Sequence, residues 1–141
     1  MRNLLFALPF FFLAETGPQL PVPANPQSVL QWDAPATNAD GTPLLDLAGY
    51  VVALSLPGVD LNQGSAPLIQ VDVTEATITE QAIAPLVVAQ PEGIYQLWVR
   101  AYDDAQNLGA WSDPLLIQID AARPSVPTGL RIKVTVIVEV Q

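Results

Sequence analysis

The chain has 141 residues, half of them apolar, and 14 prolines and 8 glycines interrupt it every few residues. This length supports one folded domain with appendages, and the frequent breaks favour short strands and turns over long helices. The sequence contains no cysteine and no histidine. Disulfides, thiolate chemistry and Cys/His metal sites are therefore excluded.

The net charge of −9 is unevenly distributed along the chain. Between Pro18 and Ala122 there are twelve acidic residues and a single basic one, Arg100. The other basic residues are Arg2, Arg123, Arg131 and Lys133. Because so acidic a body repels phosphate backbones, we expect no nucleic-acid partner, and solubility is the ordinary role of such charge.

Residues 1–17 open with an apolar run. Met1–Ala14 carries one positive charge followed by apolar residues, which is the layout of a secretory signal peptide and too short to span a bilayer comfortably. Cleavage after Ala14 would leave Phe12 where a small residue is preferred. Two interpretations stay open: the signal peptide of an exported protein, or an uncleaved apolar arm buried in an assembly.

Residues 18–122 read as one β domain. After an extended, proline-rich lead-in, loops rich in Pro, Gly, Asn and Asp separate short segments of high β propensity. The predicted strands are Gln27–Asp33, Ala48–Ser55, Leu68–Val73, Ala76–Thr79, Gly93–Asp103 and Trp111–Asp120. Strands at this spacing without helical crossovers predict an all-β, antiparallel sandwich.

The longest of these strands, Gly93–Asp103, alternates at period two. Its apolar face, suited to a core, consists of Tyr95, Leu97, Val99 and Ala101. Its opposite face consists of Ile94, Gln96, Trp98, Arg100 and Tyr102. Because aromatic residues and arginine are enriched in contact hot spots, the candidate partner contact is Trp98, Arg100, Tyr102 and Trp111. Internal packing is the alternative, with Arg100 against Trp98 in a cation–π contact.

Residues 123–141 form a linker and a predicted C-terminal β-strand, Leu130–Val140. One face of this strand consists of Ile132, Val134, Val136, Val138 and Val140, and the other face is half polar. A free strand this apolar aggregates unless it is paired. It either completes the sheet of its own domain or adds to a neighbouring subunit by strand addition.

With these strands in place, Pro21–Asp120 resembles the fibronectin type III family, in particular its bacterial and phage members. The resemblance rests on Trp32 in an early strand, on Gly49-Tyr50-Val51-Val52, and on Tyr95-x-Leu97-x-Val99-x-Ala101. It implies an immunoglobulin-like β-sandwich and a tyrosine corner, in which the Tyr95 hydroxyl bonds backbone upstream of its strand. It implies a binding, spacer or structural module and names no ligand.

The sequence offers little for catalysis or for metal binding. Without histidine, and with its single lysine in the tail, it has no credible serine nucleophile, and the adjacent carboxylates Asp103 and Asp104 are the nearest candidates for glycoside hydrolysis. Calcium is the one credible metal, but the oxygen ligands at hand match no defined calcium loop, so turn formation is favoured and no cofactor is expected. Those ligands are Asp103, Asp104 and Asn107, or Asn38 and Asp40.

These observations predict a non-enzymatic interaction module that is exported or surface-displayed and binds protein or glycan partners. The expected location is extracellular, periplasmic or at the cell surface. The alternative is a structural subunit of a larger assembly such as a phage virion, as a capsid, decoration or tail protein. In that case the N-terminal arm and the C-terminal strand would lock into neighbouring subunits. Neither interpretation includes a stable membrane span.

Overall fold

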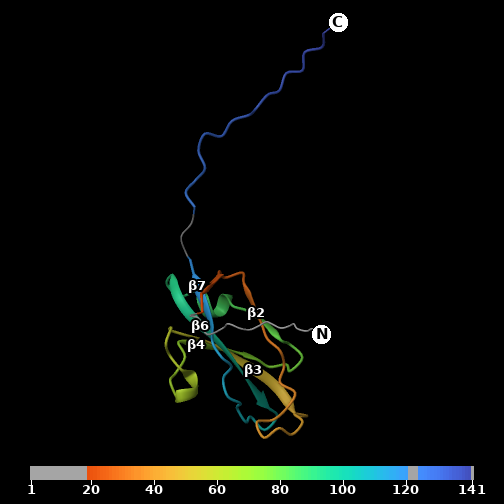
Figure 1. Ribbon diagram of the computed structural model, residues 1–141, viewed down its shortest axis with the longest axis vertical. Coiled ribbons are helices and arrows are strands. Elements are labelled where there is room, and N and C mark those ends of the chain that lie inside the picture. The colour runs from red at the N-terminus through yellow and green to blue at the C-terminus, as the bar shows by residue number, and fades with distance from the viewer. Residues whose placement is uncertain (1–18, 121–123, 141) are drawn as a thin grey trace, which may run out of the picture.

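A computed structural model describes residues 19–120 and 124–140, and the predicted N-terminal segment, residues 1–17, lies outside them. The described body is almost entirely β, with one five-stranded and one two-stranded sheet (Figure 1). In spatial order, the larger sheet consists of β1 (Val22–Ala24), β7 (Leu115–Ile119), β6 (Gly93–Asp103), β3 (Leu47–Ser55) and β4 (Ile69–Val73). The smaller sheet pairs β2 (Val29–Gln31) with β5 (Glu80–Ala82). These two sheets are compatible with the predicted β-sandwich.

The expectation of purely antiparallel pairing is wrong at one position. β1 pairs in parallel with β7, with Val22 opposite Ile117, whereas the other strand pairs are antiparallel. β1 lies in the proline-rich lead-in, which is extended as expected, and its pairing with β7 was not part of the prediction. A parallel partner needs a long connection between the two strands, and here the whole domain lies between the first strand and the last.

Two further details differ from the prediction. Residues 76–79 form a turn and its flank rather than a strand, and the strand of this region is β5, a few residues later. The chain then forms a four-residue helix, α1 (Ala84–Val87), which the sequence did not predict. Pro85 near its first turn is compatible with a helix start, but the flanking β-branched residues favour a strand. Burial of Leu86 and Val87 therefore decides the local structure.

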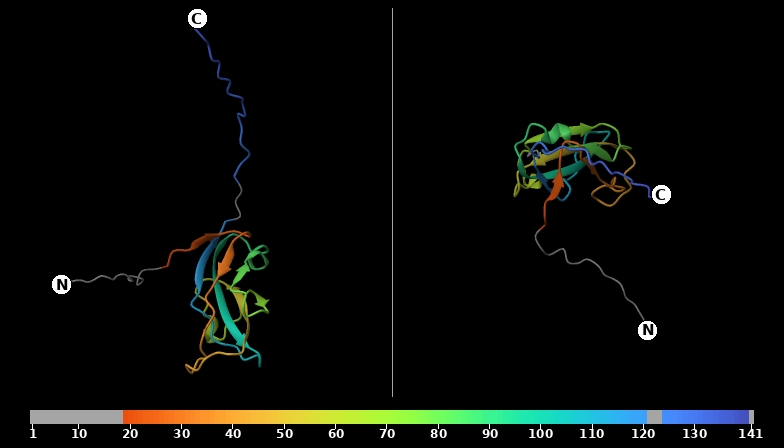
Figure 2. Two further views of the ribbon diagram at one scale, coloured as in Figure 1. Left: turned by 90° about the vertical axis from the view of Figure 1, so that its right-hand side faces the viewer. Right: turned by 90° about the horizontal axis from the view of Figure 1, so that it is seen from above.

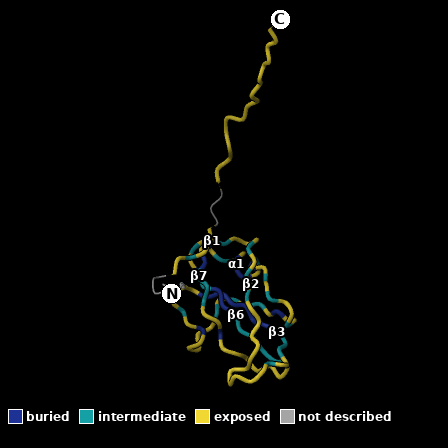
Figure 3. Tube along the Cα trace, turned by 45° about the vertical axis from the view of Figure 1, so that its right-hand side comes forward, coloured by how far each residue is buried: buried dark blue, intermediate teal, exposed yellow. Residues whose placement is uncertain are grey.

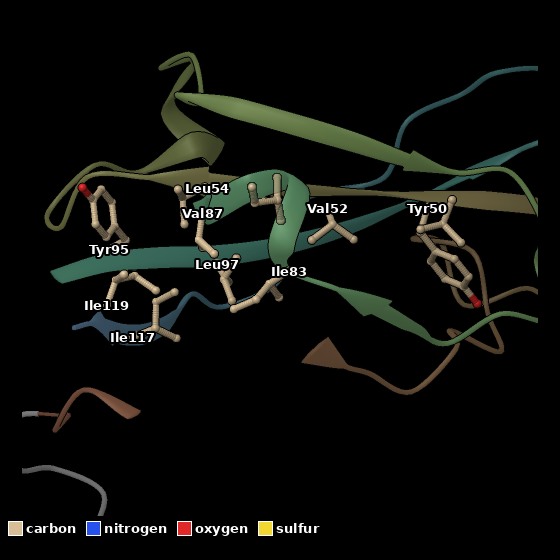
Figure 4. Packing of buried hydrophobic residues seen from close by; sticks show 11 residues of the cluster. Tyr50, Val52, Leu54, Ile83, Val87, Tyr95, Leu97, Ile117 and Ile119 are labelled. Carbon is tan, nitrogen blue, oxygen red and sulfur yellow. The ribbon is translucent and has the colours of Figure 1, made fainter. Parts of the chain in front are cut away.

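The main core lies on the inner face of the large sheet. It takes the alternate residues of β3 and β6, as the period-two pattern predicted, and α1 packs against them (Figure 4). Leu30 and Trp32 of the β2 segment cover it in part. The buried members are Tyr50, Val52, Leu54, Val73, Ile83, Leu86, Val87, Tyr95, Leu97, Ile117 and Ile119.

A second, smaller cluster lies on the outer face of the same sheet. It consists of Val51, Ala53, Leu61, Trp98 and Trp111. Because both faces of β3 are covered, its residues from Gly49 to Ser55 are all buried, as in the continuous apolar strands of a two-sided sheet. A short 3₁₀ turn, η1 (Leu61–Gln63), supplies part of this cover.

Residues 124–140 extend away from the body and form no strand pair with any described residue (Figures 1 and 2). Every one of them is exposed (Figure 3). The interpretation of Leu130–Val140 as the last strand of its own sandwich is therefore wrong for this structure. The alternative, pairing with another chain, stays a prediction.

Candidate functional site

The predicted contact face of β6 is largely a packed face. Trp98 is only 3% exposed, and its indole Nε1–H donates a hydrogen bond of 2.8 Å to the Ser55 hydroxyl. The register of the sheet places Ala53 directly opposite Trp98, and this small residue leaves room for the indole. The structure thus contains the internal packing that we considered as the alternative for this residue.

Trp111 completes the cover of this face. Its backbone N–H donates to the Asn62 side-chain oxygen at 2.9 Å, and the Asn62 amide donates back to the Trp111 carbonyl at 3.1 Å. Asn62 belongs to η1, where the Asp60 carboxylate accepts from the Asn62 N–H and Gly64 adopts a left-handed conformation. The sequence pattern does not single out Asn62, although Asp60 and Gly64 are the residue types that typically flank a short helical turn.

The cation–π contact forms with a different partner from the one we predicted. The Arg100 guanidinium lies 4.2 Å from the centre of the Trp111 ring and not over Trp98, although both tryptophans belong to the second cluster. Arg100 and Tyr102 are half-buried, so they are the members of the predicted contact that keep accessible surface. A role of these four residues in partner binding stays a prediction.

A groove of about 580 Å³ lies between residues 33–47 and residues 99–112. Its walls include the paired rings of Trp32 and Tyr50, whose centres lie 5.1 Å apart in an edge-to-face arrangement. Arg100 and Tyr102 also line it. The Trp32 indole N–H is buried and has no hydrogen-bond partner among the described residues. Apolar walls with a few polar groups are typical of ligand sites.

The carboxylates that are candidate calcium ligands accept hydrogen bonds within the loops around this groove. One Asp103 oxygen accepts from the backbone N–H groups of Ala105 and Asn107, at 2.9 and 2.8 Å, and the other accepts from the Asn107 amide at 2.9 Å. The Asn107 side-chain bond is the main reason that the pKa of Asp103 is lowered from 3.8. Asp104 donates its N–H to the Asp46 carbonyl. The Asp103 carboxylate therefore stabilises a turn through hydrogen bonds to the residues that follow it.

The second candidate calcium set has the same role. The Asp40 carboxylate accepts from the Thr42 hydroxyl at 2.6 Å and from the Thr42 N–H at 3.0 Å, and these bonds lower its pKa. Asn38 donates to the Thr42 hydroxyl in the same loop. Among the described residues, no group of three or more acidic side chains could hold a metal ion.

The C-terminal segment is the most exposed apolar surface of the described chain. Its predicted apolar face, Ile132, Val134, Val136, Val138 and Val140, is 75–93% exposed. Arg131 donates to the Gly129 carbonyl, a bond within the segment itself. The structure therefore leaves these five side chains in solvent, and the body provides them with no partner within the described residues.

Comparisons of the chain with protein-family models, with curated proteins and with solved structures found no match. In the part of the chain that the structure describes, no helix has the length and hydropathy needed to cross a membrane.

Proposed function

We propose that this protein is a non-enzymatic, fibronectin type III-like structural subunit, held in a larger assembly by its C-terminal strand. The observation that carries this proposal is the apolar segment 130–140, which has strong β propensity and no partner in its own body. Covering these branched apolar side chains with another sheet edge removes them from water and lowers the free energy of the chain.

Two features support the family part of the proposal. The Tyr95 hydroxyl donates a hydrogen bond of 2.7 Å to the Pro91 carbonyl, four residues upstream, as the tyrosine corner requires. Trp32 and Tyr50, two further residues of the resemblance, pack edge to face, with Tyr50 inside the main core and Trp32 against it. We propose the family assignment on the basis of these two contacts.

The non-enzymatic part of the proposal is supported by the hydrogen bonding of Asp103, a candidate catalytic carboxylate. Both oxygens of the Asp103 carboxylate accept hydrogen bonds from its own loop. Such a carboxylate orders a turn and is not positioned as a general acid or a nucleophile.

A binding module displayed outside the cell is the second candidate function, and the groove beside Trp32 and Tyr102 favours it. An exported form would lose residues 1–17, whereas an assembly subunit could keep them as an arm. Intact-mass measurement on the native protein separates the two, because retention of Met1 or Arg2 contradicts export by signal peptide.

The experiment for the main proposal is sedimentation of extracts of the source cells that carry the untagged chain. We expect the full-length chain to sediment with a particle much larger than its own 15.1 kDa. A chain with Val134→Pro and Val136→Pro should stay at the top of the gradient, because proline cannot donate to a strand ladder. The Thr135→Ala chain is the matched control and should sediment with the particle. A full-length chain that sediments as a free monomer overturns the proposal.

A further inference from the structure

The strand edges of the body differ in their capacity to accept another strand. β1 has three residues, one of them Pro23, which has no N–H to donate. β2 and β5 also have three residues each. β4 has five residues and no proline, and it ends the large sheet with β3 as its only partner among the described strands. β4 is therefore the longest free edge of the body.

β4 and the C-terminal segment have matching alternation. On β4, Ile69, Val71 and Val73 turn toward the main core, because they lie opposite Leu54, Val52 and Tyr50 in the sheet. The intervening Gln70 and Asp72 are exposed on the outer face. In the segment, the apolar side chains alternate with Arg131, Lys133 and Thr135. An added strand would thus extend the apolar face with apolar residues and the polar face with polar ones.

The charges of the two strands are complementary. The body carries twelve acidic residues and one basic residue between Pro18 and Ala122, whereas the segment carries Arg131 and Lys133 close to its start. Asp72, the fourth of the five residues of β4, is exposed on this free edge. If Lys133 lies opposite Asp72 in an antiparallel pair, Arg131 falls diagonally beside the same carboxylate. Opposite charges at these cross-strand positions stabilise a pair.

The same register brings apolar residues together on the inner face. Lys133 opposite Asp72 places Ile132 beside Val73 and Val134 beside Val71, and Val136 then lies beside Ile69. Val88 at the end of α1, a helix that contacts β4, is exposed, and Ile69 and Val71 are only partly buried. The apolar side chains of an added strand would find partly exposed apolar neighbours at this edge.

The course of the chain favours a second copy over the chain's own edge. Ile119 pairs with Gly93, Leu97 with Leu54, and Leu54 with Ile69, so β7 ends at the end of the sheet where β4 begins. To pair antiparallel with its own β4, the chain would first have to pass along the length of that strand and then turn back. Instead, residues 124–140 run away from the body (Figures 1 and 2).

We propose that residues 131–136 of one copy add to β4 of a second copy as an antiparallel strand, with Lys133 opposite Asp72. This inference rests on the proposed function, and it names the partner of the C-terminal strand as another molecule of the same chain. Because each copy has one donor segment and one acceptor edge, the contact is heterologous and joins copies head to tail into a ring or a filament.

Cysteine cross-linking tests this register, and the chain has no cysteine of its own to interfere. A chain with Asp72→Cys is mixed with a chain with Lys133→Cys and mildly oxidised. We expect a disulfide-linked dimer that contains one of each, because directly opposite residues in a sheet have the Cα separation that a disulfide needs. The matched control replaces Lys133→Cys by Val134→Cys, which faces the other side of the strand. Its yield with Asp72→Cys should be at least roughly fivefold lower.

A charge exchange tests the same contact in the protein without cysteine. Asp72→Lys should weaken self-association by roughly 3- to 30-fold, since it replaces an attraction by a repulsion, and Lys133→Asp in the same chain should restore it. Equal cross-linking yields at positions 133 and 134, no mixed dimer, or no effect of Asp72→Lys overturns the inference. An intramolecular disulfide in a chain with both cysteines, at dilutions where the mixed chains give none, also overturns it.

These outcomes are separate from the test of the proposed function. A chain that sediments with a particle but gives no mixed dimer keeps its structural role and takes its partner from another protein. A chain that sediments alone in cell extracts refutes the structural role itself.

Discussion

Removal of the Tyr95 hydroxyl tests the link between the sequence pattern and the fold. Tyr95 is 4% exposed, and its hydroxyl donates to the Pro91 carbonyl at 2.7 Å across the turn that leads into β6. Tyr95→Phe keeps the ring in the core and removes this part-buried bond, so the buried end of the tyrosine ring no longer donates to the carbonyl of the exposed Pro91. Loss of such a partner costs about 1–3 kcal/mol. We therefore expect the free energy of unfolding to fall by about 2 kcal/mol.

Urea denaturation followed by tryptophan fluorescence measures this change, and the dependence on urea should keep its slope because the surface exposed on unfolding is the same. For a body of about 100 residues, a loss of about 2 kcal/mol lowers the melting temperature by roughly 8–16 °C.

Tyr102→Phe is the matched control for the same strand. Among the described residues, the Tyr102 hydroxyl has no hydrogen-bond partner, so its removal should change the free energy of unfolding by less than about 0.5 kcal/mol. If Tyr95→Phe costs no more than Tyr102→Phe, the hydroxyl of Tyr95 does not stabilise the turn before β6, and the tyrosine corner loses its energetic basis.

Three further predictions concern the body. Gly49→Ala should destabilise it by more than about 2 kcal/mol in urea denaturation, because the new Cβ would clash with a backbone carbonyl of β4 and lie 2.7 Å from the Tyr102 hydroxyl oxygen. Ser55→Ala should cost about 1–3 kcal/mol in the same assay, because the buried Trp98 N–H loses its acceptor. Asp103 has a lowered pKa in the folded state, so its stabilisation is present above pH 3.8 and is lost as the pH falls through the folded-state value. Asp103→Asn should therefore reduce the difference in urea midpoint between pH 7 and pH 2.5.

Each of these has a neighbouring control. Gly109→Ala should be tolerated, since the nearest heavy atom to its Cβ would lie 3.4 Å away. Ser112→Ala removes an exposed hydroxyl that accepts from a backbone N–H, and water can replace it, so its cost should stay well below that of Ser55→Ala. Asn107→Ala should raise the pKa of Asp103 toward 3.8, which carboxyl NMR titration can follow. An unchanged titration contradicts the assignment of Asn107 as the main cause.

The alternation of β6 could be predicted because a strand exposes its two faces at a fixed period. Tyr95 and Leu97 are buried in the main core as that period requires, and β3 lies within a residue of its expected start. The short elements could not be placed in this way. β5 and α1 have three and four residues, too few for a periodic signal. α1 is placed by the burial of Leu86 and Val87 in the main core, and β5 by its pairing with β2.

The amino-acid sequence by itself determined the class of fold, the long central strand with its core face, and the unusual apolar C-terminal segment, because these depend on local periodicity and composition. Only the tertiary structure decided which aromatic residues are buried. The period-two pattern predicts that Trp98 lies on the outer face of the sheet. In the structure Trp98 and Trp111 are covered there, because Leu61 and Asn62 of a distant turn pack against that face. It also decided that the C-terminal segment finds no partner in its own sheet. The burial of these tryptophans and the pairing of strands depend on contacts between residues far apart in the chain, which local sequence patterns do not predict.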